Sequence, residues 1–289
     1  MNTTILSILL GVGGMLGWGI YDFLGGVYAK QIGPFKSFFW SQLAGLAFIL
    51  VLALVSAARG SVSILAVALS AAAAVIYSAG YLLFFKGFEI GNVSIVAATM
   101  NLWAVFTMLF AFLFMGQRLS PLQTAGVLMI ISGAALASLN WQDIRQQKFT
   151  LSAGVKEAVA GAFFFGVFWN ISEIISEQIG WLSTTLFVKF GILLFLLVFS
   201  FLVKRELNLS KAAPQTKYVV ALMGVIEAGA VALVNYGLTI GDAILITPIA
   251  SALSIVTIAL AMIFLKERVT RLQGLGMALA VLGIVVTAF

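Results

Sequence analysis

Residues 181–203 read WLSTTLFVKFGILLFLLVFSFLV, an apolar run with a single charged side chain, Lys189. A helix of about 20 apolar residues crosses the hydrocarbon core of a bilayer, and it satisfies its backbone hydrogen bonds internally, as lipid demands. Nine further stretches of this kind fill most of the 289-residue chain, which is 62% hydrophobic and 9% charged. The sequence therefore predicts an all-α polytopic membrane protein with ten transmembrane helices, at 5–28, 35–57, 62–85, 93–115, 121–139, 154–178, 181–203, 218–240, 243–265 and 270–288.

The composition also excludes several kinds of chemistry. The chain has no cysteine and no histidine, which removes disulfides, thiol catalysis and the usual ligands of zinc, haem and iron–sulfur clusters. No Gly-x-x-x-x-Gly-Lys-Ser/Thr phosphate loop is present, so ATP-driven action is not indicated. We expect no cofactor and no metal site, and the lack of histidine, cysteine and acid-rich loops argues against an enzyme. The net charge of +6 comes from cations between the spans, which indicates membrane topology rather than a nucleic-acid partner.

The two halves of the chain resemble each other. Shifting the sequence by 150 positions aligns residues 87–137 with residues 237–287 without a gap. Identical pairs that are not aliphatic carry the argument; they include Gly91/Gly241, Thr107/Thr257, Arg118/Arg268, Gln123/Gln273 and Gly133/Gly283. A shorter match aligns Gln31-Ile32-Gly33 with Gln178-Ile179-Gly180. We interpret the chain as a duplication: residues 1–140 form the first five-helix repeat, 141–153 an inter-repeat loop, and 154–289 the second five-helix repeat.

An odd number of spans in each half has a topological consequence. The second half must enter the membrane in the opposite orientation, which makes the halves inverted repeats. Inverted repeats are typical of secondary transporters, whose substrate site lies near the midplane between the repeats. The sequence therefore predicts alternating access around a central cavity.

Lysine and arginine in the short loops predict the orientation. The loops on the side of the N-terminus contain Arg59 and Arg118, whereas the opposite loops contain thirteen of the chain's sixteen cations. Since cytoplasmic loops are enriched in these residues, we expect both termini outside the cytoplasm, in a cell (plasma or inner) membrane.

Two equivalent turns point to a family. Gly116-Gln117-Arg118-Leu119-Ser120-Pro121 and Lys266-Glu267-Arg268-Val269-Thr270 each precede a glycine-rich last helix of their half. With ten short-looped spans in two five-helix halves, the chain resembles the drug/metabolite transporter superfamily, and within it the EamA-type permeases. The halves of these permeases typically have a Gly-Glu-Arg-like turn before their last helix. Gln117 replaces the usual acid and Lys266 the usual glycine. The resemblance implies transport of small organic solutes, commonly metabolite or amino-acid export that is often proton-coupled. Many members are described with cytoplasmic termini, in contrast to the orientation that this chain's charges predict.

Two predicted spans that occupy equivalent places in the halves each carry a tryptophan and an acid. Asp22 follows Trp18 by four residues in the first span, and Glu173 follows Trp169 by four in the sixth. At this spacing each acid shares a helix face with its tryptophan, and ionisable groups within spans are functional candidates. Each half thus presents a ring and an acid to the predicted cavity, which suits a substrate with an apolar body and a cationic or hydrogen-bonding head.

Lys189 and Glu227 lie near the middles of the seventh and eighth spans. In the repeat alignment Lys189 falls opposite Gln42, and Glu227 opposite Tyr77. A buried lysine keeps its charge near an acid. These charges can bind the two ends of a zwitterion, exchange a proton for substrate, or form a static ion pair, and the residues alone leave all three open. Together, the candidate substrate- and proton-binding residues are Asp22, Glu173, Lys189 and Glu227.

Further polar and aromatic residues are candidates for the cavity wall: Trp18, Trp40, Gln42, Tyr77, Tyr81, Asn101, Trp103, Trp169, Asn170, Asn235 and Tyr236. Pro248 is expected to kink the ninth span beside the cavity. The predicted function is a proton-coupled exporter of amino acids or other metabolites. The alternative is sugar or nucleoside/nucleobase uptake, because aromatic and amide side chains also suit sugars and bases. The expected partners are a small-molecule substrate, protons and membrane lipid, for a monomer or a homodimer.

Overall fold

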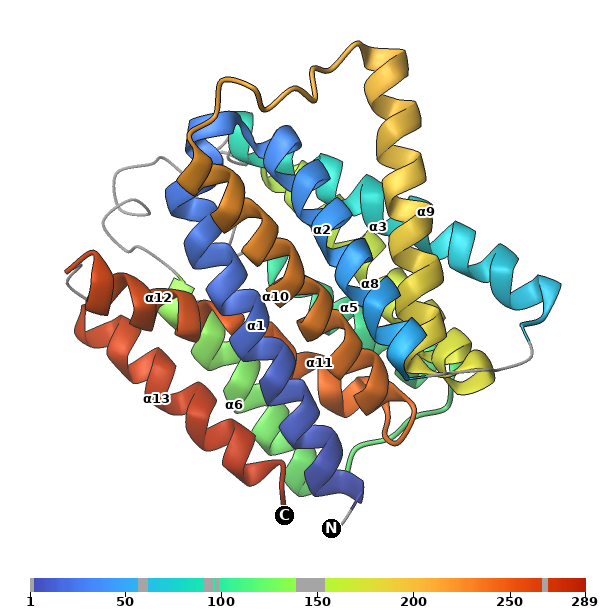
Figure 1. The fold of residues 1–289 in the computed structure, drawn as a ribbon. Helices are drawn as coiled ribbons and strands as arrows, with labels where there is room; N and C mark the ends of the chain where they lie inside the picture. Colours follow the sequence, from blue (N-terminus) through green and yellow to red (C-terminus); the bar gives the residue numbers. More distant parts are fainter. Residues whose placement is uncertain (1–2, 57–61, 91–95, 97–98, 139–153, 267–269) are drawn as a thin grey trace.

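The structure is a computed structural model that describes residues 3–56, 62–90, 96, 99–138, 154–266 and 270–289 (Figure 1). Its regular structure within these ranges is helical throughout. The first half contributes α1 (Thr3–Ile32), α2 (Pro34–Val55), α3 (Ile64–Ile90), α5 (Leu102–Phe114) and α6 (Pro121–Ser138). The second half contributes α8 (Val155–Ile179), α9 (Trp181–Val203), α10 (Pro214–Leu238), α11 (Ala243–Ser251), α12 (Leu253–Phe264) and α13 (Arg271–Val286).

Seven stretches among the described residues are long and apolar enough to cross a membrane, counting Ala243–Phe264 as one, and three shorter apolar helices accompany them. Part of the predicted fourth span, residues 93–95 and 97–98, lies outside the described residues. Ten membrane crossings therefore stay a prediction. The outward faces carry large apolar side chains, such as Leu54, Ile64 and Phe201, each more than four-fifths exposed. Lipid solvates such a surface, whereas water does not.

The predicted ninth span is interrupted rather than merely kinked. Pro248 lies inside α11 and has no backbone N–H to donate. One turn later, the Ser251 hydroxyl donates to the Pro248 carbonyl at 2.7 Å, and the Ala252 N–H turns to Ile249 O. A side chain that occupies the carbonyl competes with the helical ladder, so the helix ends at Ser251. Asn101, the repeat equivalent of Ser251, precedes α5 in the first half, so both halves have a helix end at the same level.

Two pairs of turns confirm the local similarity of the halves. Gly33 separates α1 from α2 with φ 88° and ψ 148°, and Gly180 separates α8 from α9 with φ 81° and ψ 154°. The positive φ needs glycine. Ser120 exchanges side-chain and backbone hydrogen bonds with Gln123 at the start of α6, and Thr270 does the same with Gln273 at the start of α13. These are two capping boxes at equivalent positions.

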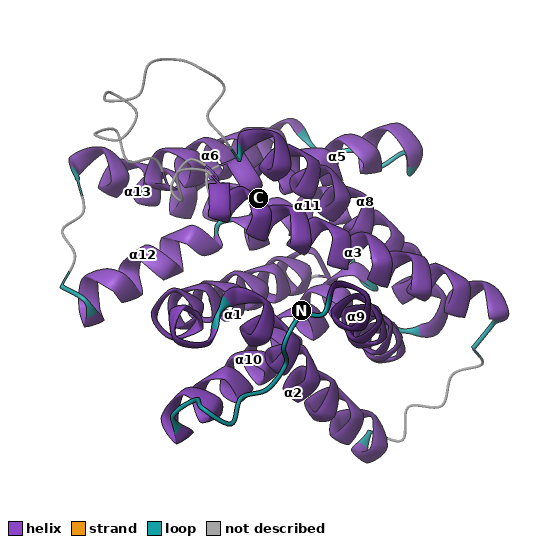
Figure 2. Ribbon diagram, turned by 90° about the horizontal axis from the view of Figure 1, so that it is seen from above, coloured by secondary structure: helices purple, strands orange, loops and turns teal. Residues whose placement is uncertain are grey.

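The helices pack in reciprocal pairs across the halves. α3 packs on α8 as α10 packs on α1, and α5 packs on α8 as α12 packs on α1. The last helices, α6 and α13, pack on each other (Figure 2). Both termini lie at one end of the bundle; α1 runs away from this end and α8 runs toward it (Figure 1). The two-repeat architecture thus relates the halves by an approximate two-fold axis that passes between α6 and α13.

Candidate functional site

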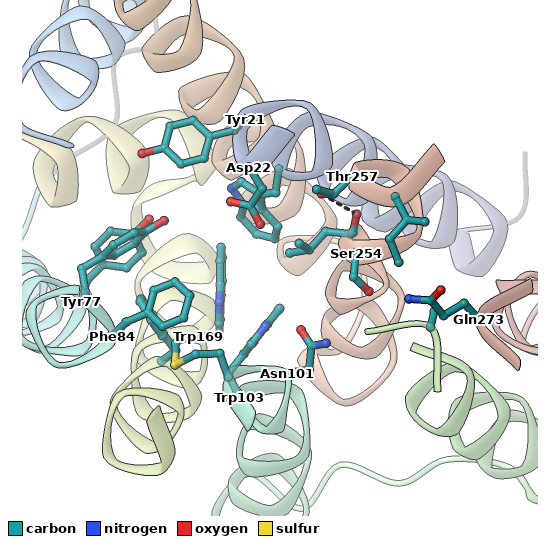
Figure 3. Close-up of a pocket in the computed structure, with 17 residues that line it drawn as sticks. Tyr21, Asp22, Tyr77, Phe84, Asn101, Trp103, Trp169, Ser254, Thr257 and Gln273 are labelled. Carbon is teal, nitrogen blue, oxygen red and sulfur yellow. Dashed lines mark hydrogen bonds between the residues drawn. The ribbon is translucent and has the colours of Figure 1, made fainter. Parts of the chain in front are cut away.

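A cavity of about 560 Å³ lies between the two halves (Figure 3). Its floor is near the middle of the bundle, at the centres of α1 and α8. Its walls reach Phe84, Ala137 and Gln273, close to helix ends remote from the chain termini. The lining residues are Trp18, Tyr21, Asp22, Tyr77, Tyr81, Phe84, Met100, Asn101, Trp103, Ala137, Phe165, Trp169, Leu253, Ser254, Thr257, Ile258 and Gln273. The cavity therefore extends from the centre of the bundle toward the lysine- and arginine-rich side.

Three tryptophans from three helices form the floor of the cavity. The ring centroids of Trp18 and Trp169 are 5.3 Å apart, those of Trp103 and Trp169 are 6.1 Å apart, and Trp18 meets Trp103 edge-on at 6.2 Å. All three side chains are almost fully buried. Because the rings contact one another, they form one rigid aromatic surface with electron-rich faces, which favours flat or cationic ligands.

Asp22 is the one formally charged residue among the described residues that line the cavity. Its side chain is exposed, one helical turn from Trp18, and projects into the space between the halves (Figure 3). Ser254, at the first turn of α12, adds a buried hydroxyl that has no hydrogen-bond partner among the described residues. Thr257 is already engaged, because its hydroxyl donates to Gly19 O at 3.0 Å. The site thus combines an acid with an uncommitted hydroxyl above an aromatic floor.

Lys189 and Glu227 lie behind the cavity wall and not in it. Their ammonium and carboxylate are 2.5 Å apart, and both side chains are fully buried. Lys189 Nζ also donates to Gln42 Oε1 at 3.0 Å, and the Tyr77 hydroxyl donates to the Glu227 carboxylate at 3.2 Å. The Lys189–Gln42 and Tyr77–Glu227 contacts each join positions that the repeat alignment places opposite each other, so this network lies on the two-fold axis. Only Tyr77 connects it to the cavity.

Glu173 also lies outside the cavity, one helical turn beyond Trp169 on the side of the chain termini. Its buried carboxylate accepts hydrogen bonds from Gln117 Nε2 at 2.9 Å on both oxygens. The Ala243 N–H donates to the same carboxylate at 3.1 Å, and the Ile244 N–H donates to Gln117 Oε1 at 3.1 Å. This set ties the turn between α5 and α6 to α8 and to the N-terminus of α11. Asp22 and Glu173, each four residues after a tryptophan, therefore have different environments.

Five other expected wall residues are placed elsewhere, which corrects the expectation for them. Gln42 belongs to the buried network above. Asn170 donates to Thr107 O and Gly166 O, and Asn235 joins Ser172 to Thr185; these are helix-to-helix bonds, the commonest use of buried amides in membranes. The Tyr236 ring packs on Trp181 at the outer surface.

Trp40 is the fifth, and it holds a connecting segment. Its indole N–H donates to Leu207 O at 2.7 Å, and it lines a separate groove with Asn208 and Lys217. Lys36 pairs with Glu206 beside it at 3.1 Å, and this ammonium lowers the pKa of the Glu206 carboxyl below its usual value. The presence of an aromatic side chain in a span thus does not predict that it lines the cavity, because its direction depends on how the helix packs against its neighbouring helices.

Several wall residues escaped the sequence reasoning, namely Tyr21, Phe84, Met100, Phe165, Ser254, Thr257 and Gln273. Ser254 and Thr257 share one helix face, immediately after the interruption at Ala252. That interruption was a usable signal, since broken helices at corresponding positions of two repeats point to the binding site. The sequence around Gln273 does not predict a role in the cavity, because its place in the capping pattern already explains the residue.

Comparisons with known proteins bear on the whole chain. The EamA-like transporter family matches residues 5–139 and 152–289. A search of curated proteins finds no match. A solved structure described only as "Crystal structure of protein" superposes with a TM-score of 0.78 at 19% identity, covering 97% of this chain and 95% of that one. At that identity the likeness shows the fold alone.

Proposed function

Because the chain belongs to the EamA-like transporter family, and is accordingly an integral membrane protein, we propose that it is a secondary transporter that exports a small organic metabolite by proton-coupled alternating access. The observation that carries the proposal is the cavity between the halves, which has an aromatic floor, one acid and a free hydroxyl. An alternating-access cycle needs a binding site at the centre of the bundle that is open to one side of the membrane at a time. This cavity begins at the centre and opens to one side.

The charges of the cavity favour a substrate with an amino group. Asp22 can pair with an ammonium, and the rings of Trp18, Trp103 and Trp169 attract the cation and cover its apolar body. Lys189 is engaged by Glu227 and Gln42, so it does not take a substrate carboxylate in this conformation. An amino acid would therefore bind chiefly through its ammonium group. A simple amine, which lacks the carboxylate, would bind with nearly the same affinity.

A second candidate is transport of a sugar or nucleobase. It is favoured by Trp103 and Trp169, whose rings are tilted by 38° to each other and can take a flat ligand, and by the hydroxyl of Ser254. The two candidates differ in their dependence on Asp22, because a neutral sugar gains far less from a carboxylate than an ammonium does.

Flux into proteoliposomes tests the proposal. The panel contains an aromatic amino acid, a matched quaternary amine, a hexose and a nucleobase, each with and without a pH gradient. We expect gradient-driven flux of an amine-bearing compound that falls to the background of empty vesicles in Asp22→Asn. Glu157→Gln is the matched control, since it removes an acid of α8 that does not line the cavity.

Each result decides between the candidates. Hexose or nucleobase flux that is indifferent to Asp22→Asn and to pH would support the second candidate. Absence of protein-dependent flux for every compound would contradict the transport proposal itself.

A further inference from the structure

The contacts around Glu173 close one side of the molecule. We call Glu173, Gln117 and the backbone N–H groups of Ala243 and Ile244 the latch. Gln117 belongs to the first half, whereas the other three belong to the second half. The latch lies on the side of the bundle that carries both termini, because Glu173 follows Trp169 by one helical turn on α8 and α8 runs toward that end (Figure 1). The latch joins the two halves on the side opposite the open cavity. The latch must therefore break before the molecule can open on the side of the termini.

The latch suits only an ionised Glu173. Within the part of the chain that the structure describes, the groups that hydrogen-bond this carboxylate are all donors: Gln117 Nε2, which reaches both oxygens, and the Ala243 N–H. The N-terminus of α11 adds its positive end. A protonated carboxyl has an O–H that must donate, and the latch offers it no acceptor. Protonation therefore removes the hydrogen-bond complementarity on which the closed contact depends.

No cation compensates Glu173 among the described residues around it. The charged groups that face it are the acids Asp242, at the start of α11, and Glu177, on α8. Arg118, next to Gln117, directs its guanidinium to Phe112 O and to Gln117 O instead. An ion pair would hold the charge over a wide pH range, whereas neutral donors beside two further acids do so weakly.

Asp22 and Glu173 lie on opposite sides of the tryptophan floor. Asp22 follows Trp18 by one helical turn and is exposed in the cavity, whereas Glu173 follows Trp169 by one turn on the closed side and is 1% exposed. Because α1 and α8 run in opposite directions (Figure 1), an opening on the side of the termini would expose the acid of α8 as the present cavity exposes the acid of α1.

We propose that the latch is the closed gate on the side of the termini, that a proton on Glu173 releases it, and that Glu173 then becomes the acid exposed in a cavity on that side. This inference rests on the alternating access of the proposed function. It assigns the coupling proton to Glu173 and the resting-state substrate cation to Asp22.

Cysteine labelling tests the gate directly, because the natural chain contains no cysteine. Ser176→Cys reports on the closed side: Ser176 is buried one turn beyond Glu173, and its hydroxyl has no partner. Ile258→Cys reports on the open cavity, because Ile258 lines the cavity and is partly exposed. In nanodiscs, which expose both sides to a water-soluble maleimide, we expect rapid labelling of Ile258→Cys and slow labelling of Ser176→Cys.

Adding Glu173→Gln should raise the labelling rate of Ser176→Cys about tenfold and lower that of Ile258→Cys, as a population shift demands. Glu157→Gln is the matched control, since it removes an acid at the other end of the same helix and leaves the latch and the acids that face Glu173 unchanged. Faster labelling of Ser176→Cys without protection of Ile258→Cys would mean local loosening and would overturn the proposal.

Gln117→Glu gives a test that misfolding cannot imitate. In the natural latch, acid should speed labelling of Ser176→Cys, because protonation of Glu173 breaks the contact. With two carboxylates facing each other, alkaline pH should open the latch by repulsion, and acid should close it through a shared proton. Rates are divided by those of Gln178→Cys, an exposed site on α8, to remove the intrinsic pH dependence of the thiol.

The outcomes separate this inference from the proposed function. A pH dependence of the same sign in the natural latch and in the Gln117→Glu variant would overturn the latch, even if substrate flux were intact. If the natural protein showed no substrate flux, the transport proposal would be contradicted, whatever the labelling rates.

Discussion

Lys189 and Glu227 illustrate how a charge can be inside a span and yet be remote from substrate. Gln42 and Tyr77 complete the hydrogen bonds of the pair, so its burial is compensated. Removing one partner leaves the other charge buried and unpaired, whereas replacing both with apolar side chains removes the desolvation cost as well. We therefore expect the single substitutions to lower stability much more than the paired apolar substitution.

We predict that Lys189→Gln and Glu227→Gln each cost about 3–5 kcal/mol of stability, whereas Lys189→Met with Glu227→Leu costs much less. Thermal unfolding in detergent measures the difference. Equal destabilisation by the single and double changes would contradict a mainly structural pair. A double variant that is stable but inactive in flux would assign the pair to transport.

Replacing Ser254 should change substrate affinity without lowering stability. Its hydroxyl has no partner, so Ser254→Ala should not lower stability, but it should weaken substrate binding roughly fivefold, the value of one hydrogen bond of about 1 kcal/mol. Quenching of tryptophan fluorescence by the transported compound measures affinity. Ser176→Ala is the control, because Ser176 is also unpartnered but lies outside the cavity. Equal affinities of the two variants would exclude Ser254 as a ligand.

At the scale of elements, α6 and α13 hold the two repeats together through glycine. A Cβ at Gly133 would lie 2.5 Å from Ala280 N and from Gly276 O. A Cβ at Gly283 would lie 2.5 Å from Gly126 O. Since equivalent glycines face equivalent backbone, the helices approach closely along their whole contact, the usual role of small residues in membranes.

Gly133→Leu should therefore separate α6 from α13 and cost more than about 2 kcal/mol. Gly274→Leu is the matched control on α13, because nothing lies within 4 Å of its added Cβ. Thermal unfolding and the fraction of monodisperse protein after extraction measure the effect. Similar stability of both variants would show that the close approach is dispensable.

At the scale of the whole molecule, the approximate two-fold axis relates the closed side to the open side. The open cavity faces the lysine- and arginine-rich loops, which positive-inside topology places in the cytoplasm. On this topology the conformation described here is open to the cytoplasm, with both termini on the other side, and an exported substrate enters beside Asp22.

Two exposed serines check this orientation. Ser120 lies in the turn between α5 and α6, on the side of the termini, and Ser210 lies between α9 and α10, on the opposite side. In intact cells, a membrane-impermeant maleimide should label Ser120→Cys and not Ser210→Cys. The reverse pattern would show that the termini are cytoplasmic and that the cavity opens outward.

Much of this architecture was readable in the sequence because its signals are local. Apolar length predicts helices, Gly33 and Gly180 predict sharp turns, and the Ser120/Gln123 and Thr270/Gln273 patterns predict helix starts. The duplication was readable too, since equivalent places in a fold need equivalent residues, notably the glycines of the last helices. Trp18, Asp22 and Trp169 line one cavity, whereas Glu173, four residues after Trp169, does not.

The sequence by itself determined the membrane environment, the helices and the two-repeat plan, since lipid requires apolar length and closed backbone hydrogen bonding in each segment separately. Only the tertiary structure decided which buried polar groups face the cavity. Glu173, Lys189 and Asp22 all lie within long apolar helices. Yet Glu173 accepts hydrogen bonds from Gln117 and from the start of α11, Lys189 pairs with Glu227, and Asp22 is exposed in the cavity. That distinction depends on partners far away in the chain, such as Gln117 for Glu173 and Glu227 for Lys189, which no local pattern specifies.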